Sequence, residues 1–332
     1  MKKRLVKLLA PALVVGLVAT ASGCGGKQEP EAVGGGKCEA GSGSITIATG
    51  NSTGVYYVVG GGLAQVISKN TDLKATAAET GASVQNIEQL VDGTYDVAFS
   101  LSDTAADAVN GNESFDQPQP VRALTNLYPN TTHVVVRADS GIDSLEDMKG
   151  KTISTGSPKS GTEVIANRLL EQAGVDPAKD IKAQRLDMVK TADGMKDGTI
   201  DGLFWSGGLP TPQITDLFTS LGDKVKFIDV SPMLPKMKEI NDVYEASTIS
   251  KDVYKTPEDI KTFDTPNVLL VKDDFAKSNA CAITKLIFDK KQQLVKVHPA
   301  SKDISLDTAR QTTPVKLHPG AEQALDELKA PK

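Results

Sequence analysis

A duplicated pattern constrains the fold of this chain more than any other feature of its sequence. The pentapeptides Asp92–Asp96 (DGTYD) and Asp197–Asp201 (DGTID) are nearly identical and lie 105 positions apart. Thr49-Gly50 and Thr155-Gly156, which lie 106 positions apart, each end an expected strand and open a loop of small residues. Chance can produce either match alone, but two matches at one spacing indicate two similar α/β lobes. The 332 residues, of which 39% are hydrophobic, suffice for two lobes of ordinary domain size.

Each lobe is expected to alternate strands with helices. The first lobe is predicted to contain strands at 44–49, 73–79 and 95–100 and helices at 56–68 and 84–91, with Ser83 as the N-cap of the second helix. The second is predicted to contain a short helix at 144–149, strands at 151–155 and 202–206, and helices at 162–173 and 187–196. Segments 127–137 and 265–271 are expected to cross between the lobes. The helical segments 274–297 and 320–329 are expected to pack on the first lobe.

The matched loops, 50–54 and 156–161, are the predicted binding elements. Ligands of open α/β sheets bind beyond the carboxyl ends of the strands, so two facing lobes would bring both loops into one cleft. Each loop precedes a helix, whose N–H groups and dipole favour an anion such as a carboxylate or phosphate. Neither loop contains Arg, which leaves hydroxyls and helix ends as the main anion-binding groups.

Positive side chains near the cleft remain an open question at this point. Lys159 lies inside the second loop, where it either contacts a ligand or extends into solvent. An arginine from elsewhere, Arg122, Arg137 or Arg168, is a further alternative. Gly156 and Gly161 have the glycine spacing of a P-loop, but Thr162 follows where that motif needs Lys, which argues against nucleotide hydrolysis.

The N-terminus is predicted to be an export signal rather than part of the fold. Four positive residues precede an apolar run at 8–21 that is short for a membrane span. Small residues then lead to Cys24, and this arrangement resembles a bacterial lipobox in which the cysteine is lipidated. We therefore expect a lipoprotein signal peptide at 1–23, a flexible Gly-rich tether at 24–43, and a lipid anchor on the outer face of the cytoplasmic membrane. A plain secretory signal with an incidental cysteine is the alternative.

The remaining reactive residues give little support to an enzyme. Cys38 and Cys281 either form a disulfide, which is permitted outside the cytoplasm, or remain free thiols. The chain has three histidines, and they form neither a Ser-His-acid grouping nor a Cys/His metal spacing. We predict no catalytic residues, no metal and no cofactor. The net charge of −5, without a basic stripe, argues against a nucleic-acid partner.

From about Ile45 to the C-terminus, the chain resembles the TAXI-family solute receptors of tripartite ATP-independent periplasmic (TRAP) transporters. The resemblance depends on the order and coverage of several separated motifs rather than on any one of them. These motifs lie at 48–57, 60–63, 93–103, 127–129, 133–141, 156–163, 298–304 and 314–321.

The resemblance implies a type II periplasmic-binding fold, in which a hinge closes two lobes around a small solute. Lobe 1 would comprise 44–132 plus 265–332, and lobe 2 would comprise 133–264. A monomer is expected, with an ion-driven membrane permease as partner and glutamate, glutamine or another small carboxylate as ligand. The binding residues carried over by position are Asn51, Thr53, Tyr56, Tyr57, Ser83, Ser102, Ser157, Ser160, Gly161 and Thr162. Trp205, the only tryptophan, is added from its place at the end of a second-lobe strand, where it either forms an aromatic wall of the cleft or packs into the core.

Two departures from the family pattern leave the ligand open: Lys159 stands where a small residue is more usual, and Trp205 stands where smaller residues are frequent. Two other classes of function compete with this interpretation. The same fold serves ATP-binding-cassette (ABC) importers, and a neighbouring gene for a permease without an ATPase would favour the TRAP system. An extracellular enzyme or signalling module would need a catalytic set that three histidines do not supply.

Overall fold

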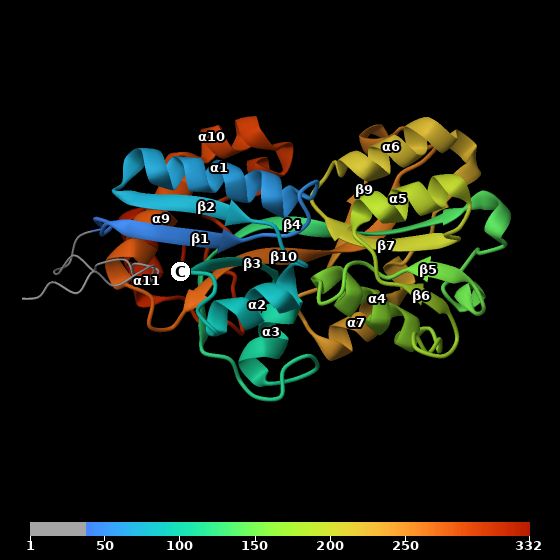
Figure 1. Cartoon of the computed structure of the whole chain (residues 1–332), viewed down its shortest axis with the longest axis horizontal. Helices are drawn as coiled ribbons and strands as arrows, with labels where there is room; N and C mark the ends of the chain where they lie inside the picture. The colour runs from blue at the N-terminus through green and yellow to red at the C-terminus, as the bar shows by residue number, and fades with distance from the viewer. Residues whose placement is uncertain (1–37) are drawn as a thin grey trace, which may run out of the picture.

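The computed structural model describes residues 38–332. The predicted signal peptide at 1–23, the lipidation site Cys24 and the predicted tether up to residue 37 lie outside the described residues. Figure 1 shows two α/β lobes side by side, joined by the long strands β4 (Val121–Arg137) and β10 (Ile260–Lys272). Both predicted crossing segments lie within these strands. The predicted boundaries between the lobes, at 132/133 and 264/265, fall inside β4 and β10, and they stay a prediction.

The first lobe places strands β1 to β3 between two layers of helices. Its elements are β1 (Gly43–Ala48), α1 (Val55–Asn70), β2 (Leu73–Ala78), α2 (Ser83–Val91), β3 (Val97–Leu101) and α3 (Ser102–Asn110). The C-terminal part adds α9 (Lys277–Asp289), α10 (Lys291–Val297), η5 (Pro299–Asp303) and α11 (Pro319–Glu327). As predicted, these C-terminal helices pack on the first lobe, because Ile283 and Leu294 share a core cluster with Ile45.

The second lobe has the same layered construction. Its elements are η1 (Ala138–Ser140), η2 (Glu146–Met148), β5 (Thr152–Ser154), α4 (Gly161–Gln172), β6 (Lys182–Gln184), α5 (Met188–Asp197), β7 (Gly202–Gly207), α6 (Pro212–Leu221), η3 (Gly222–Lys224), β8 (Val225–Phe227), η4 (Ser231–Met233), α7 (Leu234–Ile240), β9 (Glu245–Ile249) and α8 (Lys251–Tyr254). Within residues 38–332, no helix combines the length and the apolar character that a membrane crossing needs.

The sheet topology repeats between the lobes. The strand order is β2-β1-β3-β10-β4-β7-β5-β6, so β1 lies between β2 and β3 just as β5 lies between β6 and β7. All four of these pairings are parallel. The connecting strands are antiparallel to their neighbours: β10 to β3 and β4, and β4 to β7. The duplication predicted from two short motifs therefore extends to whole strand–helix units.

The repeated pentapeptides form the same contact in both lobes. The Asp96 carboxylate accepts from the backbone N–H of Thr46 at 2.7 Å, and the backbone N–H of Asp96 donates to the Thr46 carbonyl at 3.0 Å. Asp201 and Thr152 form the same reciprocal pair, with both bonds at 2.8 Å. Each aspartate thus joins the start of one parallel strand to its neighbour, which explains why both copies end in Asp.

Alternating strand residues supply the cores on the two faces of the sheet. In β4, Val134 and Val136 face the cluster that contains α4, while Val135 faces the cluster that contains α5 and α6. In β3, Phe99 packs with α1 and Ala98 packs with α2. This period-two pattern, buried on both faces, is typical of strands covered by helices on both sides.

Three local predictions were wrong. Ser83 is the first residue of α2 and caps nothing, because its Oγ accepts from the backbone N–H of Leu101 at 3.1 Å. The helix predicted at 144–149 is a single 3-10 turn, in which the Asp147 carboxylate accepts from both N–H and Oγ of Ser144. Residues 38–43, predicted as the end of the tether, are fixed to the first lobe: Gly41 N donates to Asn279 Oδ1 at 2.8 Å, and Cys38 forms a disulfide with Cys281.

Candidate functional site

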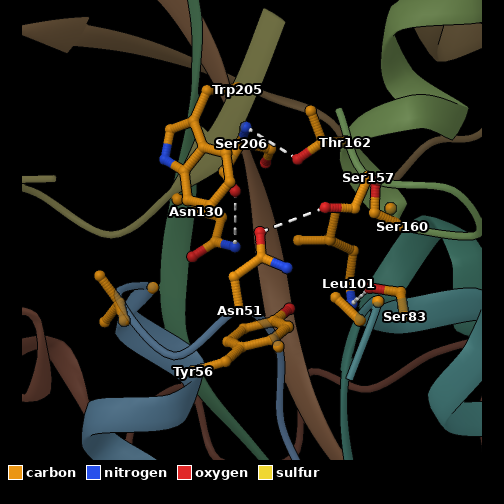
Figure 2. Close-up of a pocket in the computed structure, with 17 residues that line it drawn as sticks. Asn51, Tyr56, Ser83, Leu101, Asn130, Ser157, Ser160, Thr162, Trp205 and Ser206 are labelled. Atoms are coloured by element: carbon orange, nitrogen blue, oxygen red, sulfur yellow. Dashed lines mark hydrogen bonds between the residues drawn. The ribbon is translucent and has the colours of Figure 1, made fainter. Parts of the chain in front are cut away.

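A cavity lies where the two lobes meet, at the carboxyl ends of the strands. Its lining comes from the loops after β1, β2 and β5, from the ends of β3 and β7, and from Asn130 in β4 (Figure 2). Its volume is about 40 Å³, room for a compact group only. The lining residues are Gly50, Asn51, Gly54, Val55, Tyr56, Gly81, Ala82, Ser83, Leu101, Asn130, Ser157, Ser160, Gly161, Thr162, Trp205, Ser206 and Gly207.

Most of the predicted binding residues come together at this cavity. Those that line it are Asn51, Tyr56, Ser83, Ser157, Ser160, Gly161, Thr162 and Trp205. Thr53, Tyr57 and Ser102 do not line it. Of the two adjacent tyrosines, Tyr56 is therefore the one that faces the cleft. Its hydroxyl donates to Asn267 Oδ1, and burial, followed by the nearby Tyr128, raises the Tyr56 pKa well above its ordinary value.

The two matched loops touch across the cavity. Ser157 Oγ donates to Asn51 Oδ1 at 3.2 Å, which joins the loop after β5 to the loop after β1 (Figure 2). The backbone N–H of Gln85 donates to the Lys159 carbonyl at 3.1 Å, and Lys159 Nζ forms an ion pair with Glu88 at 2.7 Å. Lys159 therefore binds the opposite lobe and does not line the cavity.

Glycine at position 161 permits this close approach. A Cβ at that position would lie 2.5 Å from Leu101 Cδ1 and 2.7 Å from Ser83 Oγ, both on the other lobe. Ser160, just before it, accepts from the backbone N–H of Glu163 at 3.0 Å and so caps α4. The local sequence thus gives α4 a capped start with a side-chain-free surface toward the first lobe.

The second lobe contributes hydroxyls and an indole ring. Trp205 Nε1 donates to Thr211 Oγ1 at 2.9 Å, which fixes the ring beside the cavity. Thr162 Oγ1 accepts from the backbone N–H of Ser206 at 3.2 Å. Ser206 is 6% exposed, and its own Oγ has no partner among the described residues.

Asn130 was missed by the sequence analysis. Its Nδ2 donates to the Ser206 carbonyl at 3.4 Å, and its Oδ1 accepts from Asn267 Nδ2 at 2.8 Å. Asn130 and Asn267 thus connect the two crossing strands beneath the cavity. Each predicted crossing segment contains an asparagine, and this polar side chain in an extended segment was the sequence signal from which Asn130 could have been found.

A buried ion cluster joins the two lobes. Arg168 of α4 contacts Asp103 at 3.2 Å and Asp107 at 2.6 Å, both in α3 of the other lobe. Tyr244 donates to Asp103 and accepts from Arg168. Burial raises the pKa of Asp107 to about 7, opposed by the Arg168 guanidinium and assisted by the Asp103 carboxylate. Arg168 is therefore engaged by these acids, and neither Arg122, Arg137 nor Arg168 lines the cavity.

All three histidines make contacts that stabilise the fold. His298 and His318 are N-caps, in which Nδ1 accepts from the backbone N–H of Ala300 or Gly320. His133 is fully buried in β4, between the Thr131 carbonyl at 2.8 Å and the Tyr254 hydroxyl at 2.9 Å. Burial lowers the pKa of His133 to about 4. None of them lines the cavity.

One group of potential metal ligands occurs within residues 38–332, formed by Cys38, Cys281 and Glu327. Both of its sulfurs belong to the disulfide. Metal coordination by cysteine requires the thiolate, so the group does not fit a metal site.

Solved structures with the same fold cover most of the chain. A protein from Bordetella bronchiseptica RB50 has 20% identity and a TM-score of 0.54, over 86% of this chain and 89% of that one. The binding protein component of an ABC phosphonate transporter from Pseudomonas aeruginosa has 15% identity and a TM-score of 0.53, over 79% of this chain and 80% of that one. An ABC uptake transporter substrate binding protein from Streptococcus pneumoniae, with bound histidine, has 13% identity and a TM-score of 0.51, over 79% and 94%.

These matches confirm the predicted α/β periplasmic-binding-protein fold. The Pseudomonas and Streptococcus neighbours are both named as binding proteins. A family model also matches residues 47–328, which include both lobes and every residue that lines the cavity. The chain therefore belongs to the NMT1-like family.

Proposed function

We propose that the protein is an extracytoplasmic solute-binding receptor that closes its two lobes on a small organic anion and presents it to a membrane transporter. The observation that carries the proposal is the cavity between the matched loops, to which both lobes contribute polar groups. A ligand that contacts both sides stabilises the closed arrangement by its differential affinity for that state. The named neighbours, binding proteins of transport systems, support this interpretation.

The transporter and the anchor belong to the same proposal. The motifs shared with TAXI receptors favour a TRAP permease as partner, with a small carboxylate such as glutamate as ligand, and Cys24 as the lipidated residue on the outer face of the cytoplasmic membrane. An ABC importer is the second candidate, favoured by the two ABC binding proteins among the structural neighbours. Co-purification of the full-length lipoprotein with the product of an adjacent permease gene, with or without an ATPase, distinguishes the two transport systems.

Binding is testable with the protein's own fluorescence. Trp205 is the only tryptophan and lines the cavity, so its emission reports on the cavity alone. We expect native mass spectrometry of the freshly purified protein to reveal a retained small solute. Adding that solute to the stripped protein should shift Trp205 emission and raise the melting temperature. A panel of small acids that changes neither signal, together with a mass spectrum without solute, would refute the proposal.

Gly161→Ala tests lobe closure separately from folding. The added methyl would lie 2.5 Å from Leu101 of the other lobe, so closure should be obstructed and affinity should fall at least tenfold. Gly61→Ala in α1 is the matched control, because its Cβ would meet nothing within 4 Å. The control should bind normally. Equal affinity of the two variants would argue against closure at this cavity.

A further inference from the structure

The chemistry of the cavity lining narrows the class of ligand. None of its seventeen residues is Asp, Glu, Lys, Arg or His. An ammonium group inside a protein needs acceptors, preferably a carboxylate, because an unpaired buried charge is strongly unfavourable. Each of the two side-chain amide oxygens of the lining already accepts one hydrogen bond, Asn51 Oδ1 from Ser157 and Asn130 Oδ1 from Asn267. The cavity therefore offers a poor environment for a cation.

Donors, in contrast, converge on the cavity. The first residues of α1, α2 and α4, Val55, Ser83 and Gly161, all line it. The first N–H groups of a helix have no partner within the helix, and the helix dipole makes this end positive. No side chain caps α1 or α2, whereas Ser160 caps α4. The third N–H of each helix is already bonded, since Tyr57 N donates to the Gly54 carbonyl and Gln85 N donates to the Lys159 carbonyl. The first two N–H groups of α1 and of α2 have no partner among the described residues and stay available to another acceptor.

Ser206 provides an independent indication of where a ligand contacts the second lobe. It is 6% exposed, lines the cavity, and carries an Oγ without a partner among the described residues. Buried hydroxyls are normally hydrogen-bonded, so an unpartnered one in a cavity indicates a missing partner. Ser206 lies beside Thr162 and Trp205, on the opposite side of the cavity from Asn51 and Tyr56 (Figure 2).

We infer that the ligand of this cavity is a compact organic anion without an ammonium group, and that the Ser206 hydroxyl donates to it opposite the starts of α1 and α2. The inference depends on the proposed solute-binding function and narrows it. Amino acids such as glutamate are thereby disfavoured relative to acids of the same carbon skeleton.

Two matched pairs of acids test the inference on the full-length protein, stripped of any retained solute. Propionate and alanine form the smaller pair, glutarate and glutamate the larger, and within each pair only the ammonium group differs. Calorimetry should give at least tenfold tighter binding of the acid without the ammonium group in the pair that fits. Tighter or equal binding of the amino acid would overturn the inference while leaving the solute-binding function intact.

The two proposals fail in distinguishable ways. If none of the four acids binds and native mass spectrometry recovers a cationic, zwitterionic or neutral solute, the inference is wrong and the proposed function stands. If no solute is recovered or bound at all, both are wrong. Recovery of an anion without an ammonium group supports both.

Ser206→Ala tests the residue assignment. Its Oγ bonds nothing within the described chain, so the melting temperature of the variant should be unchanged or raised. Affinity for the preferred acid should fall about tenfold, the value of one hydrogen bond to a charged group. Ser278→Ala is the matched control, since Ser278 also has a buried hydroxyl without a partner in the described part of the chain but lies in α9 and does not line the cavity. Unchanged affinity in Ser206→Ala would overturn the assignment of this hydroxyl.

Discussion

The two lobes have the same topology but contribute different chemistry to the cavity. The first lobe supplies uncapped helix starts, at Val55 of α1 and Ser83 of α2. The second supplies a capped helix, the Trp205 ring and the Ser206 hydroxyl, which has no partner within residues 38–332. A duplicated scaffold therefore positions two loops opposite each other, while different residues at the loop ends line the two sides of the cavity. The residues that repeat between the lobes set the topology, and the residues that line the cavity differ, in line with the general separation of fold from function.

The lobes also differ in how they are held together. The first is crossed by the disulfide Cys38–Cys281 and covered by the C-terminal helices. The second has an aromatic cluster, in which Phe218 and Phe227 stack at 4.9 Å and Tyr254 packs beside them. Four predictions challenge this comparison, beginning with the contact that joins the lobes.

Arg168→Met should have the largest effect. It would leave the buried carboxylates of Asp103 and Asp107 without their cation, and removal of one partner from a buried ion pair costs about 4 kcal/mol. Denaturant unfolding gives the free energy of unfolding directly. Arg185→Met is the control, because Arg185 also forms an ion pair, with Glu163, but its side chain is more than half exposed. This substitution should lower the free energy of unfolding by less than about 1 kcal/mol. Similar losses in both variants would show that the cluster is not a stabilising contact between the lobes.

Removing the disulfide should weaken the first lobe. The bond joins residues 243 positions apart, and loss of a native disulfide costs about 3 kcal/mol, chiefly through the entropy of the unfolded chain. A Cys38→Ser/Cys281→Ala variant should show faster hydrogen exchange in α9 and β1 than the wild type, with little change in α5 and α6. Alkylation should label two more thiols after reduction than before. No increase on reduction would contradict the bond itself.

Asn86 and Thr191 occupy matching positions, 105 residues apart, but make different contacts. Asn86 Nδ2 donates to the carbonyls of Thr49 at 2.7 Å and Phe99 at 2.8 Å, and its Oδ1 accepts from Thr80. Thr191 makes one side-chain hydrogen bond, between its Oγ1 and Ser154 Oγ, at 2.6 Å. Asn86→Ala would leave several buried groups unpaired and should cost about 3 kcal/mol, against about 1 kcal/mol for Thr191→Ala. If thermal and denaturant unfolding gave equal losses of stability for the two variants, the extra hydrogen bonds of Asn86 would not distinguish the first lobe from the second.

Much of the fold was predictable because its signals are local. The duplicated strand–loop–helix units depend on Asp-Gly turns, small-residue loops and apolar strands, and these occur within a few residues of each other. The crossing strands followed from two extended segments, although the 13-residue length of β10 was not evident. Ser83 was misassigned because a serine before a helix usually caps it, whereas here its hydroxyl bonds Leu101 of a neighbouring strand.

The site was only partly predictable for the same reason. Asn51 and Ser160 lie in the matched loops, so their position followed from the repeat. Asn130 lies inside a strand, and only the three-dimensional path of β4 past the end of β7 brings it to the cavity. The ion pairs of Arg168 and Lys159 depend on partners in the other lobe, which no local pattern indicates.

The smallest expected effect concerns acid stability of the second lobe, through His133. Burial among Phe227 and Tyr254 lowers its pKa to about 4, whereas an unfolded histidine titrates near 6.5. Between these two pH values His133 is protonated in the unfolded chain but neutral in the native lobe. The free energy of unfolding therefore falls as the pH drops from about 6.5 toward 4. Between pH 7 and pH 5 the protonation of this residue in the unfolded chain should lower the free energy of unfolding by about 2 kcal/mol. His133→Gln cannot titrate, so its stability, though lower at pH 7, should fall less over the same interval. Parallel pH profiles for the two proteins would mean that His133 is protonated in the native state, and its hydrogen bonds to Thr131 and Tyr254 would then need a different assignment of donors.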